Sequence, residues 1–405
     1  MHIPFLGRRR QPAPLERAIA LSERLVTRAG EADGTRVATA LAGTVASLNP
    51  PALLAYFRWL VSDCGPPPTE LLAAAGAYVA EPNVANAARV TRAAEPARQE
   101  LLRRINTASG GTALIVGLRA TLLGLLTDHP ELEPLEADMR HLLASWFNRG
   151  FLKLRRIDWH TSAAILEKLI AYEAVHTIAS WDDLRGRLGG DRRCYGFFHP
   201  ELPEEPLIFI EVALTDSISD AIAPLLAHPP ERSEPPAPTT AIFYSISNCQ
   251  RGLRGISFGN FLIKQIAAEL KAETPSLETF ATLSPVPGFR RWLDARGRGP
   301  GDDLAALCAT YLTTGKADPV GAFHLANGAR LERINLNADL SEKGRRQSYG
   351  VMVNYRYLAD AIEANHEAFV GRDKVATSST VKALRKRGVA LNETRFRLGM
   401  NGQRS

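Results

Sequence analysis

Polar side chains stand at the ends of short apolar runs in the second half of the chain, where strands commonly present reactive groups. His199 precedes a proline, Glu211 interrupts the apolar run 207–214, Ser284 opens a Ser-Pro-Val-Pro-Gly segment, and His324 follows a phenylalanine. An imidazole gains or loses a proton near neutral pH, and a serine hydroxyl both donates and accepts hydrogen bonds. These residue types therefore fit acid–base or hydrogen-bonding chemistry.

Each of these residues also has a structural interpretation. A histidine before a proline is commonly a turn residue, Glu211 could be a buried salt-bridge partner or a strand-edge acid, and Ser284 could cap a following helix. No G-x-S-x-G elbow surrounds Ser245, Ser247 or Ser284, which disfavours a serine hydrolase. No H-E-x-x-H or similar ligand spacing occurs either, so we expect no metal.

A strand, a glycine-rich turn and a helix are predicted in the middle of the chain. The run 241–246 is short and mostly apolar, which is typical of a buried strand. Alternation along this strand places Phe243 and Ser245 on one face and Tyr244 on the other. Apolar residues then recur at helical spacing, which predicts a helix that starts near Gly255.

The turn between this strand and helix has the composition of an anion site. Gly252, Gly255 and Gly259 allow a close approach of the backbone, and free N–H groups at a helix start attract anions. Arg251 and Arg254 add guanidinium groups, which fit phosphate oxygens. The spacing matches neither a dinucleotide fingerprint nor a Walker A loop. A solvated turn with incidental glycines and arginines remains the alternative.

Composition restricts the class of protein. The chain has 405 residues, 45% of them hydrophobic and 23% charged, which is enough to bury one or more cores. Its net charge of +6 is mild, and no basic stripe with interleaved aromatic residues predicts nucleic-acid binding. No apolar run approaches the roughly 18 residues that cross a bilayer. The four cysteines form no C-x-x-C pair, which fits a cytoplasmic protein with free thiols.

Helical periodicity dominates the first third of the chain. Amphipathic patterns predict an antiparallel bundle with a structural or oligomerising role, and its helices are expected near residues 15–25, 35–47, 51–62, 69–80, 94–107, 112–126 and 131–147. From Phe151 the pattern changes to short strands and helices, which predicts an α/β or α+β domain. We therefore expect two domains, 1–149 and 150–405. The strands are expected near 151–157, 194–198, 207–214, 241–246 and 279–283, and the later helices near 255–272, 288–294 and 301–312.

Several segments of the second domain, taken in order, resemble the malonyl-CoA decarboxylase family. They are residues 192–215, 243–264, 283–289, 323–329 and 354–357, and the helical part is also similar at 145–151 and 154–159. The resemblance implies an all-α helical bundle that assists oligomerisation, followed by a catalytic domain with the fold of the GCN5-related acetyltransferases. In that fold the strand–turn–helix unit would hold the CoA pyrophosphate.

The resemblance also implies the site residues. The family's catalytic serine and histidine fall on Ser284 and His324, and supporting substrate-binding residues fall on Ser245 and Tyr357. The CoA turn would comprise Gln250, Arg251, Gly252, Arg254, Gly255, Ser257 and Gly259. Animal members carry an acid at the position of Ser257, so no charge role carries over there.

The implied reaction is the decarboxylation of malonyl-CoA to acetyl-CoA and carbon dioxide. It needs no cofactor, because the thioester carbonyl accepts the electrons left at C2. The resemblance further implies a homo-oligomer, a dimer or tetramer, and the end of the chain lacks a peroxisomal Ser-Lys-Leu, which favours the cytoplasm. An acyl-CoA-dependent N-acyltransferase and a non-catalytic CoA-ester-binding protein are the alternatives.

Overall fold

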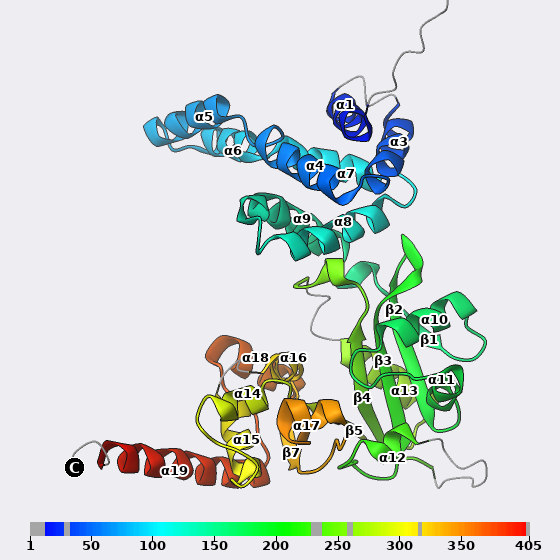
Figure 1. Ribbon diagram of the computed structural model, residues 1–405, viewed down its shortest axis with the longest axis vertical. Helices are drawn as coiled ribbons and strands as arrows, with labels where there is room; N and C mark the ends of the chain where they lie inside the picture. Colours follow the sequence, from blue (N-terminus) through cyan, green and yellow to red (C-terminus); the bar gives the residue numbers. More distant parts are fainter. Residues whose placement is uncertain (1–12, 28–32, 228–236, 257–261, 315–317, 402–405) are drawn as a thin grey trace, which may run out of the picture. The chain divides into compact units, whose positions relative to one another are not determined.

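The computed structural model describes residues 13–27, 33–227, 237–256, 262–314 and 318–401. These residues divide into two compact units, coloured along the sequence in Figure 1. The first unit spans the chain up to Leu152 and adds two later segments, 199–203 and 250–258, as far as they are described. The second unit contains the rest. The glycine turn, which the sequence assigns to the catalytic domain, therefore belongs to the helical unit.

The first unit is helical, as the sequence predicts. Its helices are α1 (Pro14–Val26), α3 (Gly34–Ala46), α4 (Pro50–Ser62), α5 (Pro68–Ala80), α6 (Val84–Ala94), α7 (Ala97–Asn106), α8 (Gly111–Leu125) and α9 (Glu133–Trp146), with short 3₁₀ turns η1 (Pro130–Leu132), η2 (Arg149–Phe151) and η3 (Arg251–Leu253). The separate helix α6 was not predicted, and Asn83 starts it by accepting a hydrogen bond from the Asn86 amide at 2.8 Å.

Local sequence explains where these helices start and which face they bury. Pro50 occupies the first turn of α4, where its missing N–H costs nothing, and Asn49 caps the helix by accepting from the Ala52 amide at 3.0 Å. In α3, buried apolar residues recur every four positions at Val37 and Leu41. Such stripes hold the bundle together by removing apolar surface from water.

The second unit is built on a mixed sheet. Its strands are β1 (Lys153–Ile157), β2 (Arg192–His199), β3 (Leu202–Thr215), β4 (Thr240–Asn248), β5 (Thr279–Thr282), β6 (Ser284–Pro285), β7 (Arg330–Asn335) and β8 (Met352–Tyr357). The strand order is β1-β2-β3-β4-β5-β8-β6, with β7 also paired to β8. The pair β4–β5 is parallel, whereas β3–β4 and β5–β8 are antiparallel. The predicted fold class, a helical region followed by a mixed α/β domain, is confirmed.

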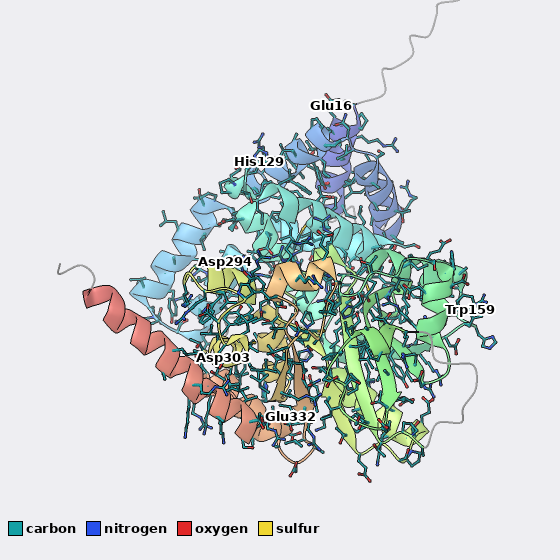
Figure 2. The ribbon with its side chains drawn as sticks, turned by 60° about the horizontal axis from the view of Figure 1, so that its bottom comes forward. Glu16, His129, Trp159, Asp294, Asp303 and Glu332 are labelled. Atoms are coloured by element: carbon teal, nitrogen blue, oxygen red, sulfur yellow. The ribbon has the colours of Figure 1, made fainter. Side chains whose placement is uncertain are left out.

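Helices make up the rest of the regular structure of this unit. They are α10 (Ala163–Tyr172), α11 (Trp181–Leu188), α12 (Ala223–Leu226), α13 (Leu262–Glu273), α14 (Phe289–Asp294), α15 (Leu304–Leu312), α16 (Pro319–Ala326), α17 (Glu342–Ser348), α18 (Ile362–Arg372) and α19 (Ser379–Asn401). Leu169 of α10 and Leu184 of α11 pack with Phe209 of β3 in one buried cluster. Asp303, labelled in Figure 2, caps α15 and also pairs with Arg387 of α19. Within the described ranges, no helix is both long and apolar enough to cross a bilayer.

The sequence expectations for this unit are incomplete in two places. The helix expected over 255–272 is described as α13 from Leu262 to Glu273; residues 257–261 lie outside the described residues, and Gly255 itself has a positive φ of 77°. Strands β7 and β8 were not predicted. Arg330, Glu332 and Arg333 make β7 too polar to be recognised as a buried strand from its composition.

The helix α16 ends in a glycine motif that fixes its last turn. The Gly328 amide donates to the Leu325 carbonyl at 3.0 Å, and the Ala329 amide donates to the His324 carbonyl at 3.1 Å. Gly328 has φ of 81°, so the pair of bonds forms a Schellman motif. A Cβ on Gly328 would lie 2.2 Å from the Ile362 carbonyl oxygen. Only glycine fits this position.

We therefore predict that Gly328→Ala destabilises the protein by about 1–3 kcal/mol or more, because it adds left-handed strain to a steric clash. Thermal unfolding followed by circular dichroism measures this loss. Gly371→Ala is the matched control, since Gly371 is an exposed position near the end of α18 with nothing within 4 Å of the added atom. The control is expected to melt at or above the wild-type temperature. Equal melting temperatures for the two variants would contradict the role of Gly328.

Candidate active site

Three predicted site residues form one buried chain of hydrogen bonds. The Nε2 atom of His324 lies 3.1 Å from the Ser284 Oγ, and its Nδ1 lies 2.8 Å from the Tyr357 hydroxyl. The Ser284 hydroxyl donates in turn to the Thr282 Oγ1 at 2.8 Å. All four side chains are buried. The structure thus brings together Ser284, His324 and Tyr357, which lie far apart in the sequence.

Strand geometry explains why these side chains meet. Thr282 ends β5 and Ser284 starts β6, so the two point to the same side of the sheet. Tyr355 and Tyr357 share a face of β8 for the same reason. The Tyr355 amide donates to the Thr282 Oγ1 at 3.1 Å, and β6 pairs with β8 through Ser284 and Val353. The pairing of β5 and β6 with β8 therefore brings the hydroxyls of Thr282 and Ser284 close to the rings of Tyr355 and Tyr357.

The histidine comes from helix α16, which was not among the helices expected from the sequence. Asp318 caps this helix by accepting from the Val320 and Gly321 amides, each at 3.0 Å. Asp318 also accepts from the Gly288 amide at 3.3 Å, which ties α16 to the segment after Ser284. The imidazole then stacks on the Tyr355 ring, with centroids 4.8 Å apart and planes 25° apart. The position of the imidazole is therefore set both by the capped helix and by the stacked Tyr355 ring.

Burial keeps His324 neutral. Desolvation lowers its pKa to about 3, since a charged imidazole would lose its hydration. The hydrogen-bond pattern also assigns the proton. Because the Ser284 hydroxyl donates to Thr282, its oxygen accepts from the Nε2–H of His324, and the free Nδ1 accepts from Tyr357. A neutral ring with a proton on Nε2 can orient Ser284 or pass a proton through it.

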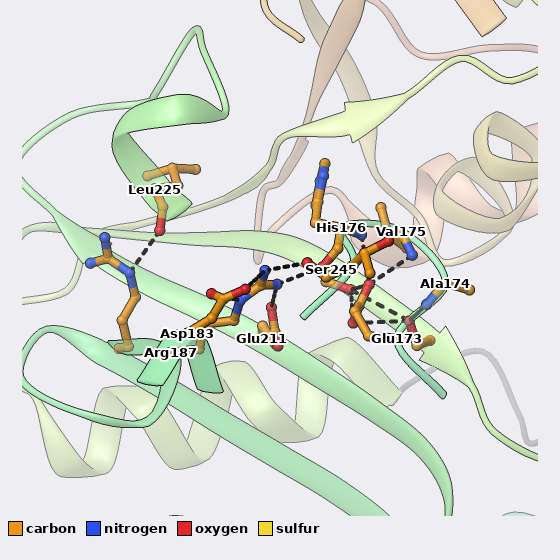
Figure 3. A network of polar contacts seen from close by, with 12 residues as sticks. Glu173, Ala174, Val175, His176, Asp183, Arg187, Glu211, Leu225 and Ser245 are labelled. Atoms are coloured by element: carbon orange, nitrogen blue, oxygen red, sulfur yellow. Dashed lines mark hydrogen bonds and ion pairs between the residues drawn. The ribbon is translucent and has the colours of Figure 1, made fainter. Parts of the chain in front are cut away.

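Ser245 lies in a different network. Its hydroxyl donates to both carboxylate oxygens of Glu173, at 2.9 and 2.8 Å (Figure 3). The Ser247 hydroxyl donates to the same carboxylate at 3.2 Å. Glu173 also accepts from the Val175 and His176 amides. Among the described residues, the structure therefore gives Ser245 a buried carboxylate as its partner and does not place it in the chain formed by Ser284 and His324.

A β-bulge accounts for this separation. Phe243 pairs with Val212 while Ser245 pairs with Glu211, and the register shifts between those two residues of β3. Adjacent residues of β3 face opposite sides, so Phe243 and Ser245 also face opposite sides. The expectation that the two share a face was wrong because alternation breaks at a bulge, which leaves no clear signal in the sequence.

Glu211 and His199 have the structural roles that were the alternatives to catalysis. The Glu211 carboxylate pairs with Arg187 at 3.2 Å, and both side chains are buried. Burial, with Glu173 nearby, raises the pKa of Glu211 to about 8. The His199 Nε2 lies 3.1 Å from the Trp146 carbonyl, and its Nδ1 accepts from the Glu201 amide. His199 thus ends β2 and is held by backbone hydrogen bonds next to the turn that follows.

The expected CoA turn is described from Gln250 to Ile256. Arg251–Leu253 forms the 3₁₀ turn η3, with Gly252 buried and the side chains of Arg251 and Arg254 exposed. Ser257 and Gly259 lie outside the described residues. In the described part of the chain, no group of three or more His, Cys, Asp or Glu side chains is placed to hold a metal ion.

Two family models match the chain. The model of the malonyl-CoA decarboxylase N-terminal domain matches residues 64–147, and that of the malonyl-CoA decarboxylase C-terminal domain matches residues 150–311 and 301–395. The chain belongs to the malonyl-CoA decarboxylase family. The mitochondrial malonyl-CoA decarboxylase of Mus musculus is 34% identical over 356 residues, which cover 73% of this chain and 72% of that protein.

Crystal structures of bacterial malonyl-CoA decarboxylases are also similar. The one from Rhodopseudomonas palustris is 47% identical with a TM-score of 0.86, and the match covers 92% of this chain and 100% of that one. The one from Agrobacterium vitis is 44% identical with a TM-score of 0.85, covering 91% and 99%. The architecture of both units is therefore shared with solved members of the family.

Three residues around this site were missed from the sequence. Thr282 and Tyr355 gave no signal, since their roles depend on strand pairing between distant segments. Asp318 could have been found, because an aspartate followed by Pro319 is a common helix start. Recognising that start would have placed His324 on a helix in this family member.

The neutral state of His324 has a consequence for stability at acid pH. The unfolded chain protonates this residue below about pH 6.5, whereas the folded chain keeps it neutral down to about pH 3. The unfolded state therefore binds more protons between these values, and stability falls as the pH falls. We predict that His324 contributes a slope of about 1.4 kcal/mol per pH unit, which His324→Gln lacks.

Urea unfolding of both proteins at several pH values between about 4 and 7 measures the difference between their slopes. Other titrating groups, such as His176 with its pKa lowered to about 4 by burial, are common to both proteins and cancel. His160→Gln is the control, since His160 is exposed. Parallel curves for wild type and His324→Gln would show that His324 is not held neutral.

Proposed function

We propose that this protein decarboxylates malonyl-CoA to acetyl-CoA and carbon dioxide, with Ser284 and His324 as its catalytic residues. The observation that carries the proposal is the buried chain from Tyr357 through His324 to Ser284 in a member of the malonyl-CoA decarboxylase family. Such a chain supplies hydrogen bonds and a proton in a site poor in water, which are the two requirements of this reaction.

The chemistry follows from where charge moves. When the carboxylate leaves as carbon dioxide, the electron pair of the broken C–C bond passes into the thioester, which becomes an enolate. A hydrogen bond from Ser284, whose hydroxyl would turn from Thr282 to the substrate while His324 orients it, would hold the malonyl group with its carboxylate out of the thioester plane and stabilise the enolate. A proton from the Ser284–His324–Tyr357 chain then converts C2 into the methyl group, and solvent replaces that proton.

The glycine turn is proposed to bind the phosphates of CoA. Arg251 and Arg254 support this, because both side chains are exposed and neither has an ion-pair partner among the described residues. Gln250, Gly252 and Gly255 would contribute backbone and side-chain contacts, as would Ser257 and Gly259. Ser245 stays a proposed substrate-binding residue, although its bond to Glu173 favours a supporting role.

We also propose that the protein is a homo-oligomer in the cytoplasm. In the first unit, Leu72, Val79 and Val84 of α5 and α6 are 75%, 82% and 88% exposed, an apolar surface that a second copy would cover. The free, buried cysteines fit a reducing compartment. Light scattering of the purified protein tests the assembly, and a monomer at micromolar concentration would rule it out.

The direct test of the activity is to incubate the purified protein with malonyl-CoA and to analyse the products by mass. Acetyl-CoA and carbon dioxide in equal amounts, without free CoA, are expected. Release of free CoA that depends on an added amine would instead indicate an N-acyltransferase. Unchanged malonyl-CoA would indicate a protein that binds CoA esters without catalysis.

We predict that Ser284→Ala and His324→Ala each lower kcat by roughly 10²- to 10³-fold, since each removes a hydrogen bond made in the transition state. The double variant is expected to be little slower than the poorer single variant, because the two groups act as one unit. Losses that add in the logarithm of the rate would show independent roles. Matched circular dichroism and melting curves exclude variants that have merely unfolded.

A further inference from the structure

A buried arginine of the helical unit holds the backbone of the glycine turn. Arg119 of α8 is 1% exposed. Its Nη1 donates to the Gly252 carbonyl at 2.6 Å and to the Arg254 carbonyl at 3.0 Å, and its Nη2 pairs with the Glu136 carboxylate of α9 at 2.7 Å. One guanidinium thus satisfies two carbonyls of the turn while a carboxylate neutralises its charge.

The turn also lies directly against the backbone of α8. A Cβ on Gly252 would lie 1.9 Å from the Val116 carbonyl oxygen, so no larger residue fits there without moving the turn. Leu253 is buried next to it. Hydrogen bonds from the Arg254 and Ile256 amides back to Arg251 and Leu253 close the turn on itself. Its shape is therefore set by contacts with α8 and by its own backbone.

The turn also carries two exposed, positively charged side chains. The side chains of Arg251 and Arg254 are exposed, and no ion pair involves either of them in the described part of the chain. In Arg254, the main-chain carbonyl accepts a hydrogen bond from Arg119, whereas the side chain is exposed to solvent. A fixed backbone limits where these two guanidinium groups can reach.

We propose that Arg119 is a positioning residue for CoA binding, which fixes the turn so that Arg251 and Arg254 meet the phosphates together. This inference rests on the proposed function, since it takes the turn to be the phosphate site. Arginine suits the task because its planar fork reaches two carbonyls and a carboxylate at once, whereas lysine offers a single nitrogen. A lysine at this position would keep the positive charge beside Glu136 but would lack the planar guanidinium group that holds both carbonyls.

The test compares Arg119→Lys with Arg98→Lys. Arg98 is a matched control because it is 6% exposed, pairs with Asp138 at 2.5 Å, and lies in the same helical unit without a bond to the turn. Both variants are expected to lower the melting temperature to a similar extent. Only Arg119→Lys is expected to raise the Kd for CoA, by about tenfold in calorimetric titration, since it loosens the bonds that order the turn.

Kinetics separate positioning from a general structural effect. Arg119→Lys is expected to raise KM for malonyl-CoA by about tenfold with kcat nearly unchanged, because the chemistry at Ser284 and His324 is untouched. With malonyl-pantetheine, which lacks the phosphates, the variant and wild type are expected to behave alike. Equal effects of Arg119→Lys and Arg98→Lys on CoA binding, or an equal loss on both substrates, would overturn the proposal.

Further measurements distinguish a failure of the proposed phosphate site, or of the proposed reaction, from a failure of the role of Arg119. Arg251→Gln combined with Arg254→Gln tests the phosphate site itself, and an unchanged Kd for CoA in that variant would remove the turn, and with it Arg119, from substrate binding. If wild type makes no acetyl-CoA, the proposed reaction fails. The calorimetric comparison of Arg119→Lys with Arg98→Lys still decides whether Arg119 supports CoA binding in that case.

Discussion

The hydrogen bond between His324 and Ser284 depends on parts of the second unit that are far apart in the sequence. Ser284 is held by the pairing of β6 with β8, and His324 by the capping of α16 at Asp318 and by its Schellman end at Gly328. Burying a neutral imidazole costs least when both nitrogens have partners. Ser284 and Tyr357 supply them. The packing of these elements thus creates a site in which a histidine stays uncharged at neutral pH.

The helical unit contributes in a different way. Its α8 buries Arg119, and an isolated buried charge would cost several kcal/mol unless it were paired and hydrogen-bonded. Glu136 and the carbonyls of the turn provide those partners. The buried ion pair is therefore better understood as fixing the shape of a segment than as adding stability. The glycine turn, which follows β4 in the sequence but belongs to the first unit, is in this way held in shape by contacts within that unit.

Much of the fold could be predicted from the sequence because periodicity reflects burial. The helical first unit, the strands β1 to β5 and the change of pattern at Phe151 all follow from apolar spacing. What could not be predicted depends on contacts between distant segments. The polar strand β7 is recognised only through its pairing, and the bulge opposite Glu211 reverses the direction of Ser245 without a mark in the sequence.

The candidate site was predicted residue by residue from the family resemblance, and its geometry was not. Ser284, His324 and Tyr357 meet, whereas Ser245 bonds Glu173 instead. Residue chemistry gave His324 the strongest claim among the histidines but left His199 and Glu211 open, since a histidine or an acid at a strand end can be either catalytic or structural. Their hydrogen-bond partners decide between these roles, and partners are a property of the fold.

The central claim is that His324 is a neutral ring with its proton on Nε2, held between Ser284 and Tyr357. Nitrogen-15 NMR of the protein labelled at its histidine rings measures this directly, with His324→Gln used to assign the signals. The account predicts the neutral Nε2–H form of His324 at every pH between about 5 and 9. An imidazolium signal near neutral pH, or a neutral ring protonated on Nδ1, would contradict it.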